Sequence, residues 1–148
     1  MIKNTQQRIF VFLRLPLLIH WITIIILTSL PSDSLPSSGL DDKIEHIIAY
    51  FVLSFFIYFN FYYQDRHLIL RKYSFLFTIL FASLYGAVDE LHQLFIPGRS
   101  CDFLDWVADF IGVIIGSLSA RLLLYYLRET LENFFNKKLE PLTKKIVK

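Results

Sequence analysis

The sequence predicts an all-α membrane protein: a four-transmembrane-helix bundle with a C-terminal amphipathic cytoplasmic helix, forming one domain over residues 1–148. Apolar residues make up 55% of the chain and the mean hydropathy is +0.49, so a soluble protein of this size would lack polar surface. Four apolar stretches each approach the roughly 20 residues that cross a hydrocarbon core. Basic residues gather in alternate connecting segments. The expected spans are about 9–30, 44–63, 73–95 and 103–127.

The first span follows a basic arm and ends at a loop rich in proline and serine, residues 31–39. A cleaved secretory signal is the alternative interpretation, because Lys3, Arg8 and Arg14 precede the apolar run. However, no small-x-small cleavage site precedes Pro31, and the run is longer than the usual core of about 7–15 residues. We therefore expect a retained span.

The second span begins near Asp41, because an acidic residue suits the positive end of a helix. It is joined to the third span by a short polar segment, 64–72, which carries three basic residues. The third span ends before a turn at Pro97 and Gly98. Spans two and three are therefore expected to form an antiparallel pair.

The fourth span is the weakest of the four, because Asp109 interrupts it near its start. After it, the tail 128–148 alternates apolar residues with lysines. This pattern predicts a basic amphipathic helix on the anionic inner leaflet, with membrane lipids as its partners. Docking to a membrane partner protein is the alternative for this tail.

Charge is distributed unevenly between the two sides of the predicted membrane. The N-terminal arm, the segment 64–72 and the C-terminal end hold 13 of the 15 Lys and Arg residues, and the remaining two are Lys43 and Arg99. Because basic residues mark the cytoplasmic side of short loops, both termini are expected in the cytoplasm. These bases face lipid headgroups, so nucleic acid is not an expected partner. Nine of the 13 acids lie at the opposite side: Asp33, Asp41, Asp42, Glu45, Asp89, Glu90, Asp102, Asp105 and Asp109.

The fourth span carries acids and glycines on one face. At 3.6 residues per turn, Asp102, Asp105 and Asp109 fall with Gly112 and Gly116 inside an arc of roughly 80°. Glycines four residues apart let another helix approach closely. The acids that precede them are therefore expected to face the interior of the bundle.

The other two spans repeat this arrangement of small and polar residues at the outer side. Glu90 is expected to lie to one side of the stripe on the third span. Together the three helices would form a polar pocket that opens outward. The stripes are Ala82, Gly86, Asp89 and Gln93 on the third span, and Asp42, Glu45, His46 and Ala49 on the second.

This surplus of acids indicates a functional site. An ionisable residue at the centre of a membrane costs about 2.5–3.5 kcal/mol, less near the interface, and function is the default explanation. Nine acids face two bases and two histidines, so a metal, a cationic ligand or protonated carboxyls must balance the charge. The alternative is a structural lattice, in which Arg99 pairs with an acid while Lys43 and His46 neutralise others.

Three segments resemble the VanZ-like family of bacterial integral membrane proteins. Residues 41–50 contain D-K-x-x-H, residues 89–99 contain D-E-x-x-Q-x-F-x-P-G-R, and residues 105–112 contain D-x-x-A-[ND]-x-x-G. The match runs in order over about residues 28–120. Asp102 stands where many members have a small or hydroxyl residue. The resemblance implies that the ligand-binding residues are Lys43, His46, Asp89, Glu90, Gln93, Arg99, Asp105 and Asp109.

The resemblance also implies a location in the bacterial cytoplasmic membrane and a role in the cell envelope. The namesake of the family gives low-level resistance to the lipoglycopeptide teicoplanin. The first hypothesis is therefore a non-enzymatic protein whose outer pocket binds an amphiphile, such as a lipid-linked wall precursor or a glycopeptide. The alternative is a metal-dependent hydrolase or transferase that acts on a lipid headgroup. In that alternative the ligands for Mg²⁺ or Mn²⁺, rather than structural Zn²⁺, would come from Asp89, Glu90, Asp105, Asp109 and His46. No residue is assigned as catalytic, and the cofactor stays open.

Overall fold

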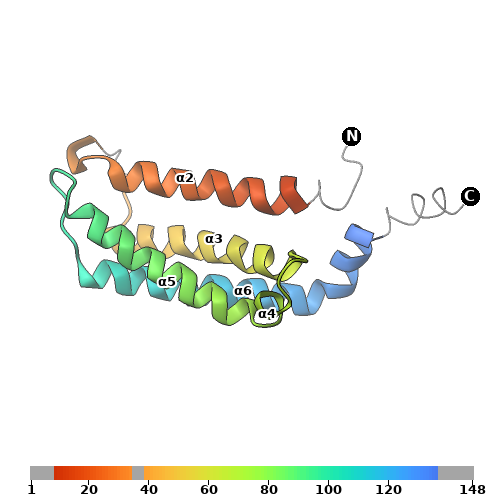
Figure 1. Ribbon diagram of the computed structural model, residues 1–148. Coiled ribbons are helices and arrows are strands. Elements are labelled where there is room, and N and C mark those ends of the chain that lie inside the picture. Colours follow the sequence, from red (N-terminus) through yellow and green to blue (C-terminus); the bar gives the residue numbers. More distant parts are fainter. Residues whose placement is uncertain (1–8, 35–38, 137–148) are drawn as a thin grey trace, which may run out of the picture.

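The structure is a computed structural model that describes residues 9–34 and 39–136, with side chains up to residue 127. The described residues are mainly helical and contain no strand. Four helices are long and apolar enough to cross a membrane, which confirms the predicted all-α bundle of four membrane helices. The chain is therefore a multi-pass membrane protein (Figure 1).

The four membrane helices lie close to the predicted ranges. The first begins with a π-helical turn, η1 (Phe10–Arg14), and continues as α2 (Leu15–Ser29). The others are α3 (Asp42–Tyr63), α5 (Ser74–Gln93) and α6 (Phe103–Asn136). Two short elements, η2 (Ser32–Ser34) and α4 (Leu68–Lys72), lie in the connections.

Helix α6 continues to Asn136, beyond the end of its apolar segment at Leu127. The side chains of residues 128–136, and all of residues 137–148, lie outside the described part of the chain. The predicted basic amphipathic tail therefore stays a prediction.

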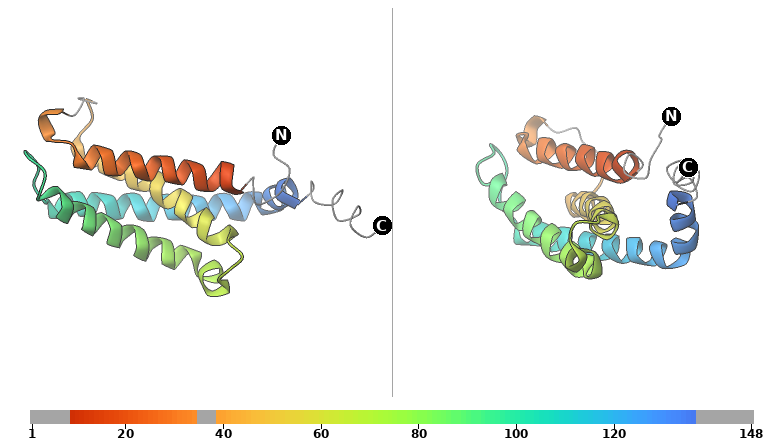
Figure 2. Two further views of the ribbon diagram at one scale, coloured as in Figure 1. Left: turned by 45° about the horizontal axis from the view of Figure 1, so that its top comes forward. Right: turned by 45° about the vertical axis from the view of Figure 1, so that its right-hand side comes forward.

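Helices α3, α5 and α6 form the packed part of the bundle, and α3 lies between α2 and α6 (Figures 1 and 2). In the most apolar stretch of the first membrane helix only 6% of the residues are buried, against 44% in that of α6. Large apolar side chains such as Ile22 and Ile26 are exposed on α2. In a membrane these side chains would face lipid, so α2 is the peripheral helix.

The closest packing is between α3 and α6, and it depends on the glycine stripe of α6. A Cβ atom on Gly112 would collide with the backbone carbonyl oxygen of Ile47, and one on Gly116 with that of Phe51. The two helix backbones therefore meet where the sequence predicts close approach. This contact fixes the rotation of α6 and turns Asp109, one turn before Gly112, into the interior.

We call the end of the bundle where α2 and α5 end, and α3 and α6 begin, the acidic end. The Asp41 side chain caps α3 by accepting a hydrogen bond from the backbone N–H of Lys43, at 3.0 Å. The two connections at this end touch, because the N–H of Ser32 donates to the carbonyl of Pro97 at 3.4 Å. This contact holds the end of α2 against the loop between α5 and α6.

Candidate functional site at the acidic end

The eight residues that the resemblance implies for ligand binding all lie at the acidic end, on three helices and one loop. The first turns of α3 supply two of them, the last two turns of α5 supply three, and the first turns of α6 supply two. Arg99 belongs to the loop between α5 and α6. In the same order they are Lys43 and His46, then Asp89, Glu90 and Gln93, then Asp105 and Asp109.

His46 and Asp109 form the central contact of this cluster. The Nδ1 atom of His46 lies 2.8 Å from Oδ1 of Asp109, which is completely buried. The second oxygen of Asp109, Oδ2, is also buried and has no hydrogen-bond partner among the described residues. The Asp109 carboxylate therefore depends on a single polar contact.

Glu90 is buried beside this pair, although the sequence places it to one side of the α5 stripe. Only 2% of Glu90 is exposed. Its Oε1 accepts a hydrogen bond from the side-chain amide of Gln93 at 3.2 Å, and its Oε2 accepts one from the backbone N–H of Asp102 at 3.1 Å. Oε1 also lies 3.9 Å from Nδ1 of His46. Glu90 thus links α5 to the start of α6.

Lys43 neutralises acids of α6 at the edge of the cluster. Its Nζ lies 2.7 Å from Oδ1 of Asp105 and 3.6 Å from Oδ2 of Asp102. The side chains of Lys43 and Asp102 are more than two-fifths exposed, so solvent screens that contact. Asp105 is buried, and its ion pair with Lys43 joins α3 to α6.

Asp89 has a partner that the sequence reasoning missed. The hydroxyl group of Tyr50 donates to Oδ2 of Asp89 at 3.3 Å, and both residues are buried. Tyr50 lies one helical turn after His46 on the same face of α3. This spacing could have identified Tyr50 as a residue of the site from the sequence.

Arg99 makes a different contact from the ion pair expected for a structural lattice. Its guanidinium Nη2 donates to the backbone carbonyl of Leu27 at 3.2 Å. Leu27 lies in the last turn of α2, where carbonyls lack the usual helical partner, and its oxygen also accepts a long hydrogen bond of 3.4 Å from the N–H of Leu30. No carboxylate among the described residues pairs with Arg99, and its buried Nε has no hydrogen-bond partner there.

A cavity of about 260 Å³ lies between α2 and the helices α3 and α5. One wall is mostly apolar and is supplied by α2, which the sequence reasoning did not connect with the site. The other wall is polar and mainly belongs to α3. The lining residues are Ile24, Leu27 and Thr28 of α2, Asp42, Glu45, His46, Ala49 and Tyr50 of α3, Asp89 of α5, and Arg99.

The cluster therefore has two parts that share His46. His46, Asp89 and Arg99 line the cavity, whereas the remaining five of the eight residues do not. Those five lie on the side of His46 that faces away from the cavity, among α3, α5 and α6, or at the edge of the cluster. Lys43, which the resemblance implies for ligand binding, is paired with Asp105, as the structural alternative expects.

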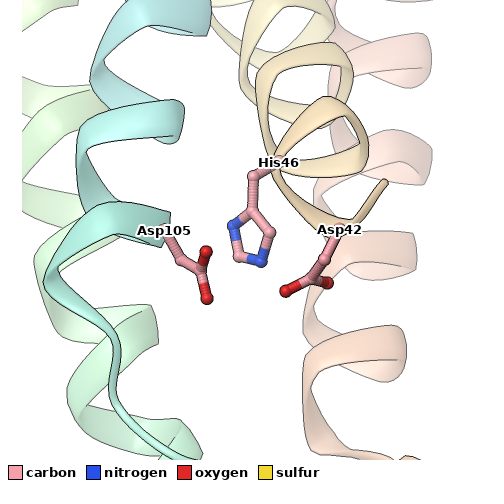
Figure 3. Close-up of side chains that lie close together, drawn as sticks. All are labelled: Asp42, His46 and Asp105. Carbon is pink, nitrogen blue, oxygen red and sulfur yellow. The ribbon is translucent and has the colours of Figure 1, made fainter. Parts of the chain in front are cut away.

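Two groups of side chains have the composition and spacing of metal ligands, and both contain His46. In the first, Asp42, His46 and Asp105 offer atoms within 4.8 Å of one another. Figure 3 shows the imidazole of His46 between the two carboxylates, which come from α3 and α6. The second group combines His46 with Glu90 and Asp109 at the same spacing, and both of its carboxylates are buried.

The fold and the site define a multi-pass helical membrane protein with a cluster of ionisable side chains at one end of its bundle. The VanZ/LLP1 family model matches residues 3–125. The chain belongs to this family, and the family resemblance of its three motifs is confirmed. No curated protein and no solved structure matches the chain.

Proposed function

We propose that this VanZ-family protein binds the headgroup of an amphiphile of the bacterial cell envelope in the cavity between α2, α3 and α5. The ligand would be a lipid-linked wall precursor or a lipoglycopeptide such as teicoplanin. The observation that carries this proposal is the two-sided lining of the cavity. Ile24 and Leu27 offer apolar surface on one side, and His46 and Asp89 offer polar groups on the other.

The cavity is large enough for part of a headgroup and too small for a whole lipid or glycopeptide. Its volume of about 260 Å³ lies just below the range of roughly 300–1,000 Å³ that holds drug-sized ligands. An acyl or prenyl chain would then stay in the bilayer, against the exposed apolar side chains of the peripheral helix α2.

The charges of the lining suggest what the headgroup carries. Arg99 has a buried Nε without a hydrogen-bond partner among the described residues, so an anionic group would satisfy it. Asp42 and Asp89 on the opposite wall suit an amine or sugar hydroxyls. A headgroup with phosphate or carboxylate next to amino or hydroxyl groups combines both features. Wall precursors and glycopeptides have this chemistry.

A fluorescence titration tests the proposal. The chain has two tryptophans, so a Trp106→Phe background leaves Trp21 as the single reporter. Trp21 packs on Tyr85 of α5 and lies one turn before Ile24 of the cavity. Teicoplanin, or a prenyl-linked wall precursor, is expected to change this fluorescence saturably. A glycopeptide without an acyl chain is the control for teicoplanin.

Two arginine variants of this reporter protein make the titration specific to the cavity. Arg99→Gln should weaken binding at least about tenfold, because a hydrogen bond to a charged group contributes about 1.5–3 kcal/mol. Arg121→Gln removes an exposed arginine of α6 far from the cavity and should leave the affinity unchanged. Absence of saturable binding by both probes, or equal affinity of Arg99→Gln and the parent, would contradict the proposal.

Low-level resistance to teicoplanin would follow if the bound amphiphile were the drug or its lipid-linked target. Cells that express the protein should then tolerate more teicoplanin than cells that express Arg99→Gln. Tolerance of a glycopeptide without an acyl chain should be equal in the two strains.

The second candidate function is a metal-dependent hydrolase or transferase that acts on a lipid headgroup. It is favoured by His46, which lines the cavity and also belongs to both groups of metal-ligand type. In that function His46 would help to hold the metal ion, and Arg99 would hold a phosphate. Release of the headgroup from a prenyl-linked precursor by the purified protein, lost in His46→Ala, would replace the binding proposal with this one.

The proposed location is the cytoplasmic membrane, with the acidic end outside and both termini in the cytoplasm. Cys101 is the only cysteine of the chain, and it is exposed in the loop between α5 and α6. A membrane-impermeant maleimide should therefore label Cys101 in intact spheroplasts. A Cys101→Ser, Arg66→Cys protein, whose cysteine lies at the opposite end, should react only after permeabilisation. The reverse pattern would invert the proposed topology.

A further inference from the structure

We propose that His46, Glu90 and Asp109 form a binding site for a divalent transition-metal ion, Mn²⁺ or Zn²⁺, buried among α3, α5 and α6. The three side chains come from three different helices, so a bound ion would tie the acidic end of the bundle together. The proposal does not depend on the identity of the ligand in the cavity, because Glu90 and Asp109 do not line it.

The spacing of the three ligand atoms suits an ion. Nδ1 of His46 lies 2.8 Å from Oδ1 of Asp109 and 3.9 Å from Oε1 of Glu90. One ligand atom from each side chain falls within 4.8 Å of the other two. Ligands at about 2.0–2.2 Å from an ion lie roughly 3 Å from their neighbours. Small side-chain rotations would therefore bring the three atoms to bonding distance.

The charge balance of the buried cluster favours a cation. Glu90 is 2% exposed and Asp109 is fully buried, so two carboxylates face one imidazole. Lys43 is held by Asp105 at 2.7 Å and Arg99 by the carbonyl of Leu27. A buried carboxylate without a partner is strongly unfavourable. A divalent cation would balance both carboxylates and would accept neutral His46 as its third ligand.

An unpaired oxygen points independently to a ligand at this position. Oδ2 of Asp109 is buried without a hydrogen-bond partner among the described residues, and such atoms are rare in folded proteins. It lies 3.0 Å from where a Cβ of Gly86 would stand, so it is directed toward α5, the helix that carries Glu90. An ion bound by both oxygens of the Asp109 carboxylate would satisfy Oδ2 as well as Oδ1.

The surrounding groups orient the three side chains as is typical of metal ligands. Ligating carboxylates usually accept further hydrogen bonds, and Glu90 accepts them from Gln93 and from the N–H of Asp102. A ligating histidine usually places its second ring nitrogen near a carboxylate. Figure 3 shows the second ring nitrogen of His46, Nε2, on the side of the ring that faces Asp42.

The ligand types select the ion. Mg²⁺ prefers oxygen ligands and retains several waters, which a buried site with an imidazole does not favour. Carboxylates suit Mn²⁺, imidazole suits Zn²⁺, and a mixed set accepts either ion. The outer group of Asp42, His46 and Asp105 is the weaker candidate, because Asp42 is exposed and Asp105 is occupied by Lys43.

Metal binding by the purified protein tests the proposal. The protein would carry a tag without histidines, be stripped with EDTA and then be given Mn²⁺ or Zn²⁺. After gel filtration we expect about one ion per chain, measured as metal content and, for Mn²⁺, by electron paramagnetic resonance. At a hundredfold excess over Kd, the unfolding temperature should rise by about 5–10 °C.

Three conservative variants locate the ion. Glu90→Gln and Asp109→Asn should lose both the retained metal and the thermal shift, whereas Asp42→Asn should keep both. If Asp109→Asn does not fold, Glu90→Gln carries the test alone. Absence of retained metal in the parent protein would overturn the proposal. Loss of metal in Asp42→Asn but not in Glu90→Gln would place the ion in the outer group, and would overturn it as well.

Discussion

Replacement of Gly116 by valine is expected to destroy the folded bundle. A Cβ at this position would collide with the backbone carbonyl of Phe51 and with the hydroxyl of Ser54 on α3. A backbone carbonyl inside a helix cannot turn aside as a flexible side chain can, so α3 and α6 would have to separate along their closest contact. Overpacking of a core costs typically about 1–3 kcal/mol, and here we expect about 3 kcal/mol or more.

The measurement is thermal unfolding in detergent, together with the yield of monodisperse protein. Ile115→Phe is the matched control, because it adds a larger group at the neighbouring position, whose side chain is exposed on the outside of α6. It should unfold near the temperature of the parent protein. If Gly116→Val were as stable as Ile115→Phe, the close contact of α3 and α6 would be wrong.

The sequence was sufficient to predict the four helices and the close packing of α6. Hydropathy and length define each span, because a backbone in lipid must satisfy its hydrogen bonds within a helix. The glycines at positions 112 and 116 predict which face of α6 meets a neighbour, and the structure places α3 there. Such features are local in sequence, so a period of 3.6 residues reveals them.

The pairing of side chains within the site was not predictable to the same degree. A helical period shows that His46 faces inward, but the relative height of two helices decides whether it meets Asp105, Glu90 or Asp109. The buried carboxylate of Glu90 accepts a hydrogen bond from the N–H of Asp102, in the loop between α5 and α6. The helical period of α5 does not show this contact. The sequence also did not show that α2 lines the cavity, because this too depends on how the helices pack. Ile24 and Leu27 are ordinary apolar residues whose position matters only once the helix is packed.

The second large effect is expected from His46→Leu in metal-free buffer. This change removes the hydrogen-bond partner of Oδ1 of Asp109, and Oδ2 already has none among the described residues. A fully buried carboxylate would then have no polar contact there. Removal of one partner from a buried ion pair costs about 3–5 kcal/mol, so we expect a loss of that size. Unfolding by denaturant in detergent with EDTA would measure it.

A double-mutant cycle shows whether the loss comes from the Asp109 charge. In His46→Leu, Asp109→Asn the carboxylate is absent, so at least about half of the lost stability should return, because contacting residues couple strongly. His92→Leu is the matched histidine control, since His92 is exposed at the end of α5 and should tolerate the change. An equal loss in the single and double variants would mean that His46 stabilises the bundle by packing alone. Recovery in the double variant would show that the charge of Asp109 requires a partner in the folded protein, whether imidazole or metal.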